Sequence, residues 1–306
     1  LGDQVRASRL LAEGRGRVEV IPYSLCLDTF RPVASEEERK SFRERHGLPL
    51  NAVCIVAGSV DWAEARKGGR LLQAALEKLA SLHRKASADV EFCLVTYGRV
   101  GANVPGVQVR NVGVVDGEEA MADLLKCCDL YVTMTKEDNL PNTVIESLAC
   151  GLPVVATRVG GIPDMVVDSV NGRLVPRDDV DAMAAALLAA VVDRDDRSRW
   201  GREARLQAQR MFQPERQAMA YAELYRDLLD EPLQEERVAN SCSSAQKGCV
   251  ERGGAEDWIP MEAFHAAMGM WSLTEIQSNE LRTKNQSLKE SNLKQKAEIK
   301  SYKQEL

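Results

Sequence analysis

The stretch from Leu130 to Thr157 decides the fold, and it reads LYVTMTKEDNLPNTVIESLACGLPVVAT. It opens with a short apolar run, Leu130 to Met134, that predicts a buried strand. After a polar loop, Thr143 to Cys150 has the spacing of an apolar helix, which Gly151 ends. Val154 to Thr157 then predicts a second strand. This order predicts two parallel strands joined by a right-handed crossover.

The same alternation of short apolar runs and helical patterns extends from Arg17 to about Pro176. The other expected strands are Val18–Pro22, Ala52–Ala57, Val90–Thr96 and Val107–Val112. The other expected helices are one that begins at Ser35, with Glu38 as its capping-box partner, and those over 67–83 and 118–127. From Asp178 to Leu229 the pattern is all helical, and it closes with apolar residues at helical spacing: Tyr221, Leu224, Tyr225 and Leu228. The fold class expected is α/β, with a doubly wound parallel, Rossmann-like sheet.

Composition divides the chain into three parts. Residues 1–230 form the α/β domain with its closing helices, 231–260 form a polar linker, and 261–306 form a helical tail. Weak heptads run from Trp271 to Leu306, with Asn285 and Asn292 at core positions. They predict either a coiled coil, through which the chain forms a homo-oligomer over residues 271–306, or a single exposed helix or a disordered tail.

The composition argues against several classes of protein. A net charge of -6 argues against a dedicated nucleic-acid binder, and three histidines argue against a metal site. Of the eight cysteines, six lie in or beside apolar runs and are typical of reduced core residues in a cytosolic protein. Without a membrane span or a signal peptide, we expect a cytoplasmic protein that can lie peripherally at the inner membrane face. The start at Leu1 rather than Met suggests a fragment.

The loop after the strand at 130–134 is the first candidate for a functional site, because ligands of an open parallel sheet bind beyond the carboxyl ends of its strands. The helix that follows offers free amides and a positive dipole end that suit a phosphate, and Pro141 fixes the backbone before it. Glu146, one turn into the helix, is placed to bind a sugar diol, and Asp138 to meet a second sugar. The structural alternative is a capping box of Thr143 and Glu146, with Asp138 capping or solvating the loop.

Two further candidates follow predicted strands. Lys67 comes after Gly58 at or just before a helix start, where an ammonium group can neutralise a diphosphate and the glycine lets a ligand approach the backbone. The alternative is a surface lysine near a flexible turn. Gly160 and Gly161 follow the strand at 154–157 and permit a tight turn with exposed amides, a pattern more often found in ordinary loops.

A longer stretch makes the pattern specific. Residues Glu137 to Asp164 read EDNLPNTVIESLACGLPVVATRVGGIPD and resemble the C-terminal domain of family 4 retaining glycosyltransferases, which have the GT-B fold. The resemblance covers residues 10–230 and is closest to a subgroup that acts on cell-surface polysaccharides and related glycans. Supporting matches are Val20–Pro22, Asp28–Pro32, Arg66–Gly68 and the closing helix at Tyr221–Leu229.

The resemblance implies roles for the charged residues. Glu146 matches the second acidic residue of the family's Glu-x7-Glu motif, which binds the donor ribose. Asp138 takes the place of the first, which faces the donor sugar; it is an aspartate where the family has glutamate, and Glu137 lies one position out of register. Lys67 matches the lysine that contacts the donor diphosphate, whereas Ser59 stands where the family has a partner arginine.

The remaining donor contacts implied by the resemblance are made largely by the backbone. Val114 and Val115 fall in the family's base-binding loop, and Gly58 and Ser59 lie at the phosphate side. The loop whose amides approach the phosphate and sugar consists of Asn139, Leu140, Pro141, Asn142 and Thr143.

The implied reaction moves a sugar from a nucleotide-diphosphate sugar to a glycan or other acceptor, with retention of configuration. Asp138 and Lys67 are the candidate catalytic residues. Positive charge and helix-end amides stabilise the leaving diphosphate, so the substrate nucleotide sugar is expected to bind without a metal or cofactor. The acceptor is expected on an N-terminal domain that precedes this chain. We therefore expect the chain alone to bind donor weakly and not to turn over.

Three other functions remain open. A GT-B sugar-nucleotide epimerase would need catalytic acids that the sequence does not place. A noncatalytic scaffold that oligomerises through residues 271–306 agrees with the departures at Ser59 and Asp138. In a longer multidomain enzyme, the helical tail would be a spacer before another catalytic domain.

Overall fold

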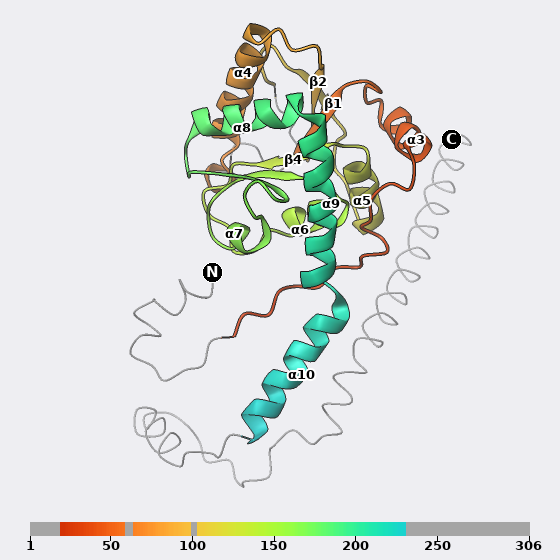
Figure 1. The fold of residues 1–306 in the computed structure, drawn as a ribbon, viewed down its shortest axis with the longest axis vertical. Coiled ribbons are helices and arrows are strands. Elements are labelled where there is room, and N and C mark those ends of the chain that lie inside the picture. Colours follow the sequence, from red (N-terminus) through yellow and green to blue (C-terminus); the bar gives the residue numbers. More distant parts are fainter. Residues whose placement is uncertain (1–18, 59–63, 99–102, 231–306) are drawn as a thin grey trace, which may run out of the picture. The chain divides into compact units, whose positions relative to one another are not determined.

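The computed structural model describes residues 19–58, 64–98 and 103–230 of the chain (Figure 1). Ser59, the linker predicted at 231–260 and the helical tail predicted at 261–306 lie outside these residues, so the coiled coil stays a prediction. Over the described ranges, no helix combines the length and the apolar character needed to cross a membrane.

The described residues contain one parallel sheet of six strands in the order β3-β2-β1-β4-β5-β6. The strands are β1 (Val53–Gly58), β2 (Phe92–Tyr97), β3 (Gln108–Asn111), β4 (Leu130–Thr133), β5 (Val154–Thr157) and β6 (Gly172–Val175). Successive strands are added outward from β1 to β3, and then outward in the opposite direction from β4 to β6. The direction of winding therefore reverses between β1 and β4, where Ile55 pairs with Leu130.

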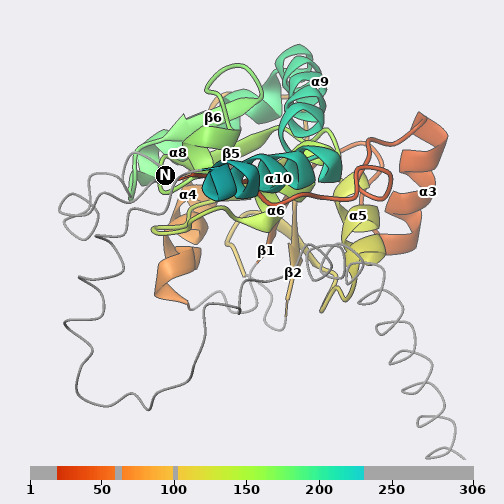
Figure 2. The same ribbon diagram turned by 90° about the horizontal axis from the view of Figure 1, so that it is seen from below.

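Helices cover both faces of the sheet (Figures 1 and 2). They are α3 (Glu36–His46), the 3-10 turn η1 (Ala65–Lys67), α4 (Gly69–Lys85), α5 (Glu118–Lys126), α6 (Asn142–Ala149), α7 (Ile162–Met165), α8 (Val180–Val192), α9 (Arg194–Met211) and α10 (Pro214–Asp230). Ile55 and Ala57 of β1 belong to a core cluster with α4 and α8, whereas Cys54 and Val56 belong to a cluster with α5, α6 and α9. Alternate strand residues thus bury opposite faces, as a doubly wound sheet requires.

The predicted α/β fold class is confirmed, and each predicted strand between residues 52 and 157 is present within two residues of its expected bounds. The helix predicted to begin at Lys67 begins at Gly69 instead. Gly68 adopts a left-handed conformation (φ 68°) that separates it from η1, so Lys67 lies in that turn. The predicted capping role of Ser35 is confirmed, because its hydroxyl accepts a hydrogen bond from the Glu38 amide at 3.2 Å.

The strand predicted at Val18–Pro22 is wrong for its described part, because residues 19–22 lie outside the sheet. Hydrogen bonds join Pro22 and Leu25 to the closing helices instead. The side-chain amide of Gln217 donates to the Pro22 carbonyl at 2.9 Å, and the Leu25 amide donates to the Phe212 carbonyl at 2.8 Å. Backbone groups of this segment that are hydrogen-bonded in this way do not require a neighbouring strand as their partner.

Helix α10, which the sequence predicted, leaves most of its apolar residues outside the core. The exposed fractions are 42% for Tyr221, 47% for Tyr225 and 52% for Leu228. The rings of Tyr221 and Tyr225 stack on each other with centroids 6.2 Å apart. Figure 1 shows α10 continuing beyond the end of α9, away from the sheet. The spacing of its apolar residues predicted α10 correctly, but such spacing does not show which part of the protein packs against the helix.

Asp129, just before β4, ties helix α3 to the sheet. Its carboxylate accepts hydrogen bonds from Arg39 and Arg43 of α3 and from the Cys54 amide of β1, the last at 2.7 Å. Arg43 is only 4% exposed, so this ion pair is buried. Five of the predicted core cysteines are buried, whereas Cys26 is exposed and that prediction is wrong.

Candidate functional site

The carboxyl ends of β1 and β4 lie side by side at the reversal of strand order, and the two segments that leave them meet there. The Lys67 ammonium group lies 2.7 Å from a carboxylate oxygen of Asp138. Arg66 lies 3.7 Å from the same oxygen. The side chains of Lys67 and Asp138 are 32% and 14% exposed. The two residues predicted to face the donor diphosphate and sugar are therefore in contact, and Lys67 is not a freely solvated lysine.

Backbone contacts fix the approach of these two segments. The Arg66 carbonyl accepts hydrogen bonds from the Lys136 amide at 2.8 Å and from the Thr135 hydroxyl at 3.1 Å. A Cβ atom at Gly68 would lie 1.9 Å from the Met134 carbonyl oxygen. The glycine thus allows η1 to lie directly against the end of β4, which fixes the backbone that carries Lys67.

The two glycines that follow β5, Gly160 and Gly161, lie against the backbone of Asp138 and Asn139. A Cβ atom at Gly160 would lie 1.6 Å from the Asp138 carbonyl oxygen, and one at Gly161 would lie 2.1 Å from that of Asn139. The Gly161 amide donates to the Asn139 carbonyl at 2.7 Å. The pair of glycines noted in the sequence therefore packs directly against the backbone of the loop that carries Asp138.

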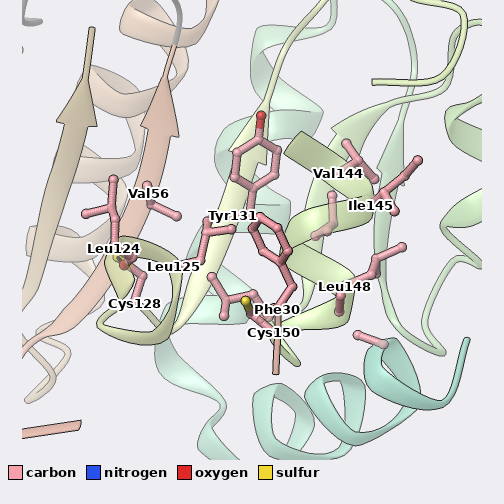
Figure 3. Close-up of a cluster of buried hydrophobic side chains, with 14 of the residues drawn as sticks. Phe30, Val56, Leu124, Leu125, Cys128, Tyr131, Val144, Ile145, Leu148 and Cys150 are labelled. Carbon is pink, nitrogen blue, oxygen red and sulfur yellow. Dashed lines mark hydrogen bonds between the residues drawn. The ribbon is translucent and has the colours of Figure 1, made fainter. Parts of the chain in front are cut away.

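The capping box considered for Thr143 and Glu146 does not form. Helix α6 has Pro141 at its N-cap position, and Thr143 lies inside the helix. The Thr143 hydroxyl instead accepts a hydrogen bond from the Tyr131 hydroxyl at 2.8 Å. Figure 3 shows Tyr131 in the apolar cluster that also holds Val144 and other α6 side chains. The amides of Val144 and Ile145 donate to the Pro141 carbonyl at 3.0 and 3.4 Å, whereas those of Asn142 and Thr143 precede the first intrahelical acceptor, so this end suits an anion.

Glu146 carries a carboxylate that is costly to bury. One of its oxygens, Oε2, is buried and has no hydrogen-bond partner among the described residues. Burial raises the pKa of Glu146 to about 7, and the negative charge of Glu118 at the start of α5 adds to the rise. A buried acceptor without a partner costs stability, which a ligand that donates to it would recover.

Tyr97, at the carboxyl end of β2, is a residue of this region that the sequence did not indicate. A Cβ atom at Gly58 would lie 2.0 Å from its ring, so the ring fills the space beside that glycine. This gives Gly58 a packing reason besides the predicted approach of a ligand. The Tyr97 hydroxyl is buried near that of Tyr131, and burial raises the pKa of Tyr97 well above its usual range.

The predicted base-binding loop lies between β3 and α5. The Gly113 carbonyl accepts a hydrogen bond from the Gly98 amide at 2.8 Å, which holds this loop beside the end of β2. Val114 is 68% exposed, and Val115 packs against the core. Helix α5, into which this loop leads, contacts α6. In the described ranges, no three His, Cys, Asp or Glu side chains are grouped as metal ligands.

Comparison with known proteins agrees with this geometry. Residues 51–193 match the family model described as Glycosyl transferases group 1. A D-inositol 3-phosphate glycosyltransferase from Xylanimonas cellulosilytica is 31% identical over 233 residues, which are 71% of this chain and 53% of that protein. The chain therefore spans about half the length of this relative.

Solved structures share the fold. Sucrose-phosphate synthase from Thermosynechococcus elongatus aligns with a TM-score of 0.60 at 24% identity, over 76% of this chain and 57% of that one. Anabaena HepE in complex with UDP-glucose aligns at 0.56 and 18% identity, over 71% and 60%. The C-terminal domain of the Francisella tularensis glycosyl transferase LpcC aligns at 0.50 and 16% identity, over 62% of this chain and all (100%) of that one. Residues 51–193 thus carry the sequence pattern of a Glycosyl transferases group 1 domain, on a parallel-sheet fold that these structures share.

Proposed function

We propose that this chain is the donor-binding half of a retaining glycosyltransferase that transfers a sugar from a nucleotide-diphosphate sugar to a glycan or other acceptor, in polysaccharide or glycoconjugate synthesis. One observation carries the proposal. At the reversal of strand order, a lysine, a paired aspartate and an unpaired buried glutamate surround the start of α6. This is where an open parallel sheet binds its ligand.

The positive charges of Lys67 and Arg66 suit the diphosphate of the donor. Lys67 has an ammonium group within reach of the loop before α6, and Arg66 adds a second positive charge beside it. The first turn of α6 presents amides and the positive end of its dipole. Charge that develops on the departing nucleotide diphosphate is stabilised by these groups, which are already in place before the reaction. This arrangement supports the proposal that Lys67 contacts the leaving diphosphate.

The hydroxyl-rich parts of the donor fit the two carboxylates. Glu146 is the proposed ribose ligand, because its unpaired Oε2 accepts hydrogen bonds and ribose offers two adjacent donors. Asp138 is the proposed contact of the transferred sugar. The solved structure of Anabaena HepE with UDP-glucose, and the glycosyltransferase names of the relatives, support a nucleotide sugar as the substrate class.

Two observations support the half-site interpretation. The chain spans about half of its D-inositol 3-phosphate glycosyltransferase relative, and its fold matches an isolated C-terminal domain over that domain's full length. Helix α10 also exposes an apolar side that includes Tyr221, Tyr225 and Leu228. We propose that an N-terminal domain brings the acceptor and covers this side of α10.

Titration of the purified chain with UDP, GDP, ADP and CDP by calorimetry tests the donor site. We expect one of them to bind, and expect Lys67→Ala and Glu146→Ala each to weaken that binding about tenfold or more. Lys85→Ala is the matched control, because Lys85 is an exposed lysine at the other end of α4. Unchanged affinity in both site variants would show that the nucleotide binds elsewhere, and no binding at all would favour the noncatalytic scaffold.

The stereochemistry requires the longer protein with its acceptor. Proton NMR of the product formed directly from a nucleotide sugar distinguishes retention from inversion at the anomeric carbon. We expect the donor's configuration in the first product observed. The opposite anomer would refute the retaining assignment while leaving the donor site intact.

A further inference from the structure

Arg66, the middle residue of η1, contacts the loop after β4 through both its backbone and its side chain. Its carbonyl oxygen accepts hydrogen bonds from the Lys136 amide at 2.8 Å and from the Thr135 hydroxyl at 3.1 Å. Its guanidinium group donates to the Glu137 carbonyl at 3.3 Å and lies 3.7 Å from a carboxylate oxygen of Asp138. Arg66 thus contacts each residue of the loop from Thr135 to Asp138.

The guanidinium group of Arg66 is also held at its other edge. Its Nη2 and Nε atoms lie 2.9 and 3.1 Å from Oε1 of Glu64, on the chain just before η1. A guanidinium group has five N–H donors in a planar, rigid fork, so these two contacts leave Nη1 to the loop. Glu64 therefore orients the group so that Nη1 faces the Glu137 carbonyl and the Asp138 carboxylate.

The carboxylate of Asp138 is shared by two cations that differ in freedom. Lys67 and Arg66 lie 2.7 and 3.7 Å from the same oxygen, Oδ2. Lysine carries one ammonium group on a flexible stem, which can turn to another anion, whereas Arg66 is held by several acceptors at once. If Lys67 turns to a diphosphate, Asp138 loses its closer counter-ion while its side chain is only 14% exposed and a second anion lies nearby. Both effects are unfavourable unless another cation stays at the carboxylate.

We propose that Arg66 is a positioning residue that keeps the Asp138 carboxylate neutralised and in place when the diphosphate of a nucleotide sugar takes Lys67. Arg66 acts through Asp138, and this role is separate from the positive charge that it adds beside the diphosphate. The inference rests on the proposed donor site and explains how Lys67 and Asp138, paired in this structure, can serve different parts of one ligand. It requires that the effect of removing Arg66 depend on the charge of Asp138.

A double-mutant cycle between Arg66 and Asp138 tests this dependence. Calorimetry measures the affinity of whichever of UDP, GDP, ADP and CDP binds the wild-type chain, for wild type, Arg66→Gln, Asp138→Asn and the double variant. Glutamine removes the charge and keeps an amide donor for the Glu137 carbonyl. We expect Arg66→Gln to weaken binding about five- to tenfold when Asp138 is present, and less than about twofold in the Asp138→Asn background.

Two further variants separate charge from structure. Arg66→Lys keeps the charge and should bind within about threefold of wild type. Arg70→Gln is the matched control, because Arg70 is an exposed arginine in the first turn of α4, and it should bind as wild type does. Thermal unfolding of each variant checks that the fold is intact.

The outcomes distinguish this inference from the proposed donor site. If a nucleotide binds in a Lys67-dependent way, and Arg66→Gln has the same effect with and without the charge of Asp138, Arg66 does not act through Asp138. The inference is then refuted and the donor site stands. If no nucleotide binds, or if Lys67→Ala leaves the affinity unchanged, the proposed site and this inference both fail.

Discussion

Glutamine in place of Glu146 keeps the shape of the side chain and removes its charge, so it isolates the electrostatic cost of burying this carboxylate. The pKa of this carboxyl rises from 4.5 to about 7 on folding. At about 1.4 kcal/mol per pKa unit, that rise corresponds to about 3 kcal/mol of destabilisation once the group is ionised in both states. Burial is the main cause, because the carboxylate loses its water and gains no partner at Oε2.

The sign of the pH dependence follows from proton binding. Between pH 4.5 and about 7, the folded chain holds a proton on Glu146 that the unfolded chain has released. The contribution of this group to stability therefore falls as pH rises through that window, and it is constant above it. Below pH 4.5 the group is protonated in both states and contributes nothing.

Urea unfolding of wild type and Glu146→Gln at several pH values from 5 to 8 measures this contribution. The difference in unfolding free energy between the two proteins should change by about 2 to 3 kcal/mol in favour of the variant as pH rises from 5 to 8. Comparing the proteins at each pH cancels every other titrating group. Parallel pH profiles would refute the reasoning, because the carboxylate would then be hydrated or paired in the folded chain.

Nucleotide binding should reverse this cost in the wild type. Ribose hydroxyls donate to the ionised carboxylate, so bound nucleotide lowers the pKa of Glu146 and affinity increases as pH rises from 6 to 8. The nucleotide's own phosphate also titrates in this range. The Glu146→Gln variant serves as the reference. Any pH dependence of affinity that remains in it comes from the ligand or from other groups, and the difference between the two proteins comes from Glu146.

Three further outcomes follow from the contacts around the site. Asp138→Asn removes the anion that holds Lys67 at 2.7 Å, so calorimetry should show bare nucleoside diphosphate binding several-fold tighter while the added affinity from the sugar is lost. Gly160→Ala should weaken nucleotide binding because its Cβ meets the Asp138 carbonyl at 1.6 Å, whereas Gly47→Ala, with a similar φ and open space, tests backbone strain alone. Asp129→Asn should lower the unfolding free energy by about 3 kcal/mol in urea, because it leaves buried Arg43 without its counter-ion.

The sequence predicted those parts of the fold whose signals are local. A four-residue apolar strand such as β5 and the apolar helix α6 are continuous in the chain, so their patterns can be read directly. Strand β6 was not predicted, because it is short, begins with glycine and includes the half-exposed Arg173. Helix α10 was predicted correctly, but its spacing reports which residues share a face and not how far that face is buried.

The site shows the same limit at the level of single residues. Lys67, Asp138 and Glu146 were found because each belongs to a continuous motif next to a predicted strand end. Tyr97 belongs to no motif, and its place in the site depends on β2 pairing with β1, so that residue 97 lies opposite Gly58. Strand order cannot be read from the periodicity of either strand. Adjacency between strands therefore determines which further residues lie beside the predicted site residues.

The contacts also explain how a site can be organised and still be ready for a ligand. The Lys67–Asp138 pair and the backbone bonds of Arg66 hold the diphosphate side in place with its charges satisfied. The proposed ribose side is different, because Glu146 keeps a buried oxygen, Oε2, without a partner among the described residues. At the proposed site, a diphosphate would displace Asp138 from Lys67, which costs part of its binding energy, whereas a ribose would give the Glu146 carboxylate a partner that it lacks. The nucleoside should therefore contribute a larger share of the affinity than the charges at the diphosphate side alone would suggest.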